Sequence, residues 1–189
     1  MTNVNGRAIA DSEQVAGHLA NCFGALYRSL GVVAPLVEDD TVMVALFEAA
    51  RRFGDVRQSF LHLRAHRDGG VTRDAPRDLL VIEEVVSASL GEDRSGALTA
   101  YVVAMVLGPR LLISLRDVSE SCTEAAEQPL REACQFAANV LVSQSRNFAD
   151  VVRDDEARDD ESWRRAANRL TAVVSQAGYS ESFGSGHSG

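Results

Sequence analysis

The stretch ALTAYVVAMVLGPRLLISLRDV, residues 97–118, decides the fold class of this chain. Its first half repeats apolar side chains at spacings of i, i+3, i+4, i+7 and i+8: Leu98, Tyr101, Val102, Met105 and Val106. Such a stripe is typical of one face of a helix. We expect Gly108 and Pro109 to end this helix and to start a second one.

The same region admits a second interpretation, an antiparallel β-meander over residues 77–118 flanked by helices. Residues 91–96 and the Gly108-Pro109 pair would then be its turns. Proline is unfavourable at the second central position of a tight hairpin turn, which favours the helices. We therefore predict an all-α fold, a compact bundle of about seven or eight helices, with the α+β meander as the alternative.

Helical periodicity continues on both sides of this stretch. The first expected helix covers residues 11–30, is followed by Gly31 as its cap, and buries one stripe: Val15, Leu19, Cys22, Leu26 and Leu30. A second helix follows Asp40 and ends at Gly54, with this apolar face: Val42, Met43, Leu46, Phe47 and Ala50. Further helices are expected over residues 55–66, 129–152 and 163–177. Together they predict one helical domain, residues 11–177, between a flexible N-terminus (1–10) and a flexible Gly/Ser-rich tail (178–189).

Composition limits the function classes. The 189 residues contain no lysine, so all 19 basic side chains are arginine, and Schiff-base or lysine-nucleophile chemistry is excluded. The formal net charge of −8 argues against generic binding to nucleic acid or to an anionic membrane. Cys22, Cys122 and Cys134 have no metal-ligand spacing, so we expect buried free thiols in a cytoplasmic protein. The most apolar run, residues 97–107, is about half the length of a bilayer span, so no membrane insertion is expected.

Histidines supply a candidate metal site. His62 and His66 are one helical turn apart, and His18 has the same spacing to Cys22. If these helices pack side by side, His18, His62 and His66 could form an open three-nitrogen site. All three lie on the flank of their helical wheels, so partly exposed surface histidines are the simpler interpretation. The sequence has no glycine-rich phosphate loop, no Gly-x-Ser-x-Gly and no Cys-x-x-Cys, and it identifies no cofactor.

Positive charge is concentrated between residues 51 and 77. Three acids in this segment accompany seven arginines: Arg51, Arg52, Arg57, Arg64, Arg67, Arg73 and Arg77. The forked guanidinium suits paired binding of carboxylates or phosphates, so the segment is a candidate patch for an acidic partner. The acidic run at residues 150–161 of a second subunit is one such partner. Solvated helix faces with local ion pairs are the alternative.

A small apolar ligand is a further candidate, bound in a pocket between helices with this lining: Phe47, Phe60, Tyr101, Met105 and Phe136. Plain core packing is the alternative for these side chains. Because no catalytic set is recognisable, the sequence predicts a non-enzymatic soluble helical protein that acts through protein–protein contacts, as an oligomeric adaptor or regulator. A small-molecule sensor or carrier, and a metal-binding helical protein, are the alternatives.

Overall fold

The computed structural model describes residues 4–63, 77–154 and 161–176, and no strand occurs within these ranges. Its α-helices are α1 (Val4–Val33), α2 (Asp40–Leu61), α3 (Arg77–Glu92), α4 (Ala97–Tyr101), α5 (Gly108–Ser121), α6 (Gln128–Asp154) and α7 (Glu161–Gln176). A π-helical segment, η2 (Val102–Leu107), joins α4 to α5 without a break, and two 3-10 turns, η1 (Ala34–Leu36) and η3 (Ala125–Glu127), follow α1 and precede α6.

The prediction of an all-α fold is confirmed for the described ranges, and the β-meander alternative for residues 77–118 is wrong. Since α4, η2 and α5 are continuous, the described part of the chain contains six continuous helices, slightly fewer than the predicted seven or eight. Helix α1 begins within the N-terminal segment that the sequence predicts to be flexible. Residues 1–3 and 178–189 of the two predicted tails lie outside the described residues, as do residues 64–66.

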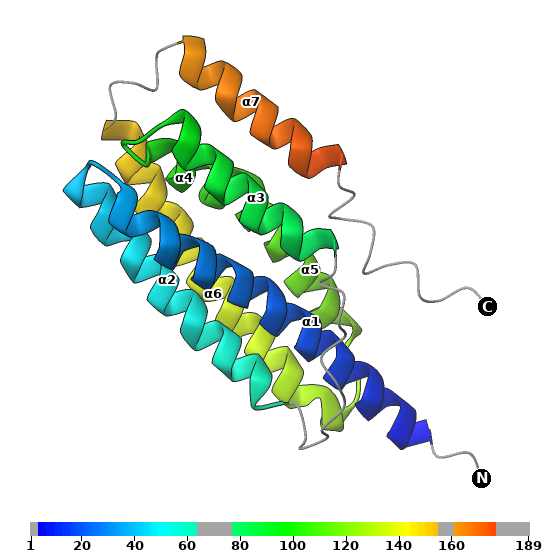
Figure 1. The fold of residues 1–189 in the computed structure, drawn as a ribbon. Coiled ribbons are helices and arrows are strands. Elements are labelled where there is room, and N and C mark those ends of the chain that lie inside the picture. Colours follow the sequence, from blue (N-terminus) through cyan, green and yellow to red (C-terminus); the bar gives the residue numbers. More distant parts are fainter. Residues whose placement is uncertain (1–3, 64–76, 155–160, 177–189) are drawn as a thin grey trace.

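The helices pack as a bundle around one hydrophobic core (Figure 1). Helices α1 and α2 form an antiparallel hairpin with the most extensive contact in the bundle. Helix α6 packs against α2 and α5, and α3 packs against α1. Helix α7 lies outside α3 and also contacts α4 and η2. The hairpin therefore keeps one long outward surface, where α1 and α2 meet.

The two predicted helices on either side of Gly54 are in fact one helix, α2. The Asp39 carboxylate caps its start by accepting hydrogen bonds from the N–H groups of Thr41 and Val42. A Cβ at Gly54 would lie 3.3 Å from the ring of Tyr27 on α1. Gly54 thus permits close approach of the two helices, and this packing offsets the roughly 1 kcal/mol that glycine costs within a helix.

The turn between α3 and α4 is built around Asp93. Its carboxylate accepts hydrogen bonds from the N–H of Ser95 at 2.9 Å and from the N–H of Leu98 at 2.8 Å. Gly96 has φ +84°, a left-handed conformation that side chains disfavour. A Cβ at Gly96 would also lie 2.8 Å from Val37 Cγ2. Both observations explain why glycine is required at this position, the residue immediately before α4.

The expected break at Gly108 and Pro109 does not occur, because the preceding turn is π-helical. The Gly108 N–H donates to the carbonyl of Val103, five residues back. Pro109 then lies in the first turn of α5, where a missing N–H is tolerated. The wide turn adds one residue to the helix and shifts its buried stripe. Met105, predicted to face inward, is 58% exposed for this reason.

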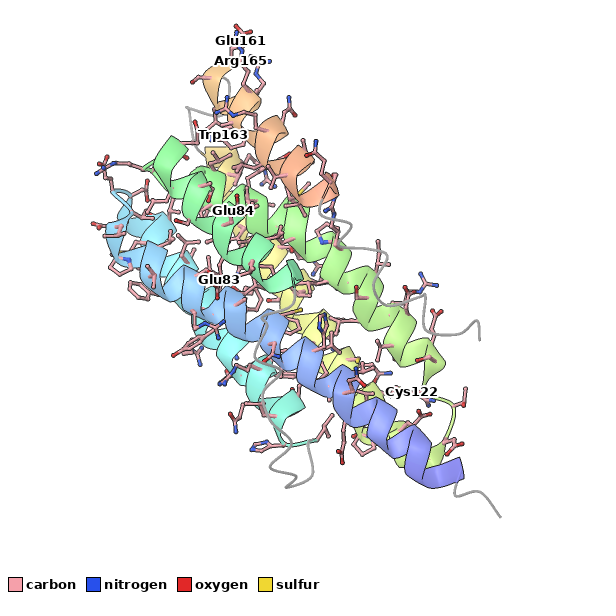
Figure 2. All side chains as sticks on the ribbon, turned by 45° about the vertical axis from the view of Figure 1, so that its right-hand side comes forward. Glu83, Glu84, Cys122, Glu161, Trp163 and Arg165 are labelled. Atoms are coloured by element: carbon pink, nitrogen blue, oxygen red, sulfur yellow. The ribbon has the colours of Figure 1, made fainter. Side chains whose placement is uncertain are left out.

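Helix α7 is anchored by its first turns. Trp163, the single tryptophan of the chain, lies in the first turn of α7 (Figure 2). It is buried and meets the ring of Tyr101 edge-on at 5.2 Å between centroids. Arg169 donates to Glu92 at 2.8 Å, which ties α7 to the end of α3. The Trp163 indole N–H has no hydrogen-bond partner among the described residues.

Candidate functional site

The predicted metal ligands are placed only in part. His18 on α1 is half-buried, with Nε2 3.6 Å from Cys22 Sγ. His62 follows α2, and its Nε2 is 3.1 Å from Nε2 of Gln58. His66 lies outside the described residues. Among the residues that are described, no group of three or more His, Cys, Asp or Glu side chains could hold a metal ion.

The predicted arginine patch divides into three parts. Arg51 and Arg52 are exposed on α2, each 4.0 Å from the same Glu48 carboxylate oxygen. Arg57 is half-buried across Gly24 of α1, where a Cβ would lie 3.1 Å from the arginine Cδ. Arg77 is the first residue of α3, and three further members lie outside the described residues: Arg64, Arg67 and Arg73.

The predicted apolar lining is dispersed. Phe60 is buried in the core, stacked on Phe23 of α1 at 6.0 Å. Tyr101 packs on Trp163, as described above. Three side chains are exposed on different helices: Phe47, Met105 and Phe136. The structure therefore does not bring these five predicted residues together around one cavity.

A pocket of about 280 Å³ occurs elsewhere, where α1 meets the end of α2 and the start of α6. Its lining is Ser12, Glu13, His62, Leu63, Ala126, Glu127, Pro129 and Leu130. Both Glu127 carboxylate oxygens already accept hydrogen bonds, from Ser12 Oγ and from the N–H groups of Thr123 and Glu124. This carboxylate therefore acts as part of the turn before α6, and the pocket offers few unengaged polar groups.

The outer surface of the hairpin carries an apolar strip that the sequence does not single out. Tyr27 covers Gly54, and Phe47 lies two turns before Gly54 on the same face of α2. Tyr27 is 46% exposed and Phe47 is 44% exposed. One turn after Tyr27, Gly31 has open space where its Cβ would be. We call Tyr27, Gly31, Phe47 and the neighbouring Arg51 the α1–α2 seam.

Sequence reasoning places Phe47 in the core and assigns no role to Tyr27. The usable signal is the distribution of glycines: Gly31 and Gly54 lie inside long helices without ending them. Glycine in a helix interior is unfavourable and often has a packing or surface reason. Gly54 faces Tyr27 and marks where α1 and α2 approach closely, whereas Gly31 lies on the exposed side of α1 with open space at its Cβ position.

Among the residues that the structure describes, the buried cysteines give no sign of an activated side chain. Burial raises the pKa of the Cys134 thiol to about 12 and also raises the pKa of Cys122 at the end of α5 (Figure 2). All three cysteines are buried thiols outside any disulfide, as the sequence predicts. Thiols with raised pKa values are poor nucleophiles, because the thiolate is the reactive form. Glu83, whose carboxylate accepts from Arg28 at 2.9 Å, and Glu84 both reach solvent from α3 (Figure 2).

Two helical stretches among the described residues are long and apolar enough to cross a membrane, Ser12–Leu36 and Ala97–Ser121. The second is longer than the sequence suggests, because Gly108 and Pro109 do not interrupt it. The most apolar 18-residue window of each stretch is mostly buried inside the bundle, 61% and 67% respectively. Core helices of soluble proteins pass the same test of length and composition.

Comparison of the chain with protein-family models, with curated proteins and with solved structures finds no match.

Proposed function

We propose that this chain is a non-enzymatic helical protein that acts through protein–protein contacts, and that the α1–α2 seam is its contact surface. The observation that carries the proposal is the pair of half-exposed aromatic rings, Tyr27 and Phe47, on one line beside the exposed Arg51. Aromatic side chains and arginine are the residues most enriched in protein interfaces, and they dominate interface energetics.

The energetics of the seam support association. Complete burial of a phenylalanine side chain gains about 1.5–3 kcal/mol, so a ring that is already half-buried gains roughly 1 kcal/mol more when covered. Covering both rings, Tyr27 and Phe47, would double this gain in association free energy. Gly31 leaves the backbone of α1 uncovered beside them, which lets a partner side chain approach closely.

The charges of the seam favour a protein partner. Arg51 lies 4.0 Å from its carboxylate partner Glu48, too far for a hydrogen bond, and its side chain is 62% exposed. Its forked guanidinium can therefore donate hydrogen bonds to a carboxylate of another chain. The net charge of −8 opposes nucleic acid and anionic membranes as partners. Buried thiols that form no disulfide fit a reducing compartment, so we place the protein in the cytoplasm.

The proposal is tested by site-specific photo-crosslinking in the source cell. A photoreactive amino acid replaces Phe47, and the control carries it at Val142, an outward apolar residue of α6 that is 38% exposed. This chemistry is required because the chain has no lysine for amine-directed cross-linkers. We expect a discrete adduct from position 47 and none from position 142. Equal labelling at both positions, or no adduct at position 47, would refute the seam as the contact surface.

A further inference from the structure

We infer that the partner at the seam is a second copy of this chain, with α2 packed antiparallel against α2 of the other copy across a two-fold axis. This inference rests on the proposed function, because it requires the α1–α2 seam to be a contact surface. It adds the identity of the partner and the direction in which the two helices meet.

The outward face of α2 has the spacing of a helix-packing stripe. Val44, Glu48, Arg51 and Asp55 follow one another at i, i+4, i+7 and i+11, so they lie on one side of the helix. All four are exposed. Phe47 flanks this stripe on the side of α1, so a helix laid along the stripe also covers the aromatic part of the seam.

The charges on this stripe complement themselves only when the second helix is antiparallel. About a two-fold axis midway between positions 48 and 51, Glu48 of each copy faces Arg51 of the other. A parallel arrangement in register would instead place Arg51 against Arg51 and Glu48 against Glu48, and like charges across an interface are unfavourable. The antiparallel register sets Val44 opposite Asp55 at the two ends of the contact.

Within one chain these charges are incompletely paired. Glu48 is the shared partner of Arg51 and Arg52, at 4.0 Å from each, and its side chain is 50% exposed. One carboxylate thus serves two guanidinium groups at the limit of ion-pair distance. A second copy would supply one further carboxylate to each arginine pair, and the symmetry would form this contact twice.

The test uses two charge-reversal variants of the full chain, Glu48→Arg and Arg51→Glu. Analytical ultracentrifugation of each variant alone should show self-association at least about tenfold weaker than that of the wild type, because each homodimer then opposes like charges twice. An equimolar mixture should form a heterodimer, since arginine at position 48 meets glutamate at position 51, and the native Arg51 meets the native Glu48. Recovery of association in the mixture cannot arise from ion pairing within one helix, because each variant alone carries only like charges at positions 48 and 51.

The matched control is Arg116→Glu on α5, which removes an exposed i, i+4 pair with Glu120 and lies away from the seam. It should leave self-association unchanged, and circular dichroism should show that all three variants remain folded. A wild type that stays monomeric at 100 µM (about the upper working range), or a mixture that does not associate more strongly than either variant alone, overturns the inference. If photo-crosslinking from position 47, and not from position 142, then captures a different protein, the proposed function stands and only the second-copy inference fails.

Discussion

Replacing Gly96 by alanine should destabilise the protein strongly, for two separable reasons. The φ of +84° is left-handed, and a side chain there costs about 1–2 kcal/mol. The new Cβ would also lie 2.8 and 2.9 Å from the two methyl groups of Val37, and forced overpacking of this kind costs about 1–3 kcal/mol. Together these predict a loss of about 3 kcal/mol in the free energy of unfolding, a large fraction of the usual 5–15 kcal/mol.

Urea denaturation followed by circular dichroism measures this loss. Gly91→Ala is the matched control, because Gly91 lies in α3 with open space around its Cβ position, and alanine there should stabilise by about 0.5–1 kcal/mol. Adding Val37→Ala to Gly96→Ala should remove the steric part, so the double variant should lose less than the sum of the two single losses. A Gly96→Ala protein within about 0.5 kcal/mol of the wild type would show that the turn is not constrained as described.

Three further outcomes are expected. Trp163→Ala should lower the free energy of unfolding by about 3–5 kcal/mol, because α7 loses its buried anchor on Tyr101; a loss below about 1 kcal/mol in urea melts would contradict that anchoring. Burial raises the pKa of Cys134 to about 12, so the unfolded state loses this proton first and stability should fall as the pH rises from about 9 towards 12; Cys134→Ala should show a shallower fall, and identical pH profiles would speak against it. Glu83→Gln breaks the exposed ion pair with Arg28 and should change stability by less than about 1 kcal/mol in the same melts, whereas a larger change would mean that the pair is shielded from water.

The sequence predicts the helices better than their ends. Apolar spacing over residues 129–152 identifies α6 to within two residues at each end. Glycine misleads, because Gly31, Gly54 and Gly108 all lie inside continuous helices. Glycine inside a helix lowers the stability of that helix by only about 1 kcal/mol. Packing between helices offsets this cost, and a local sequence pattern does not reveal that packing. Gly96 alone among these four glycines lies outside a helix, immediately before α4, where it has a positive φ and lies close to Val37.

The candidate site is predicted less well than the fold. Helical periodicity assigns Phe47 to the apolar face of α2, but the side chain lies on the outward side of the helix and is 44% exposed. Arg51 is identified from charge density alone. Tyr27 is missed, since its exposure depends on how closely the two helices approach at Gly54. Depth and proximity are properties of the packed hairpin and not of either helix alone.

The π-helical turn at η2 makes the length of helix 97–121 a constraint on the whole bundle. The turn absorbs one extra residue, so α4 and α5 keep the relative rotation that a regular α-helix with one residue fewer would give them. Removing one residue from this turn should therefore leave the contact of Tyr101 with Trp163 and the packing of α5 on α6 in place. Inserting a further residue, which the turn cannot absorb, would instead rotate the two ends of the helix by about 100° relative to each other. The spacing of residues here carries structural information that their identities do not.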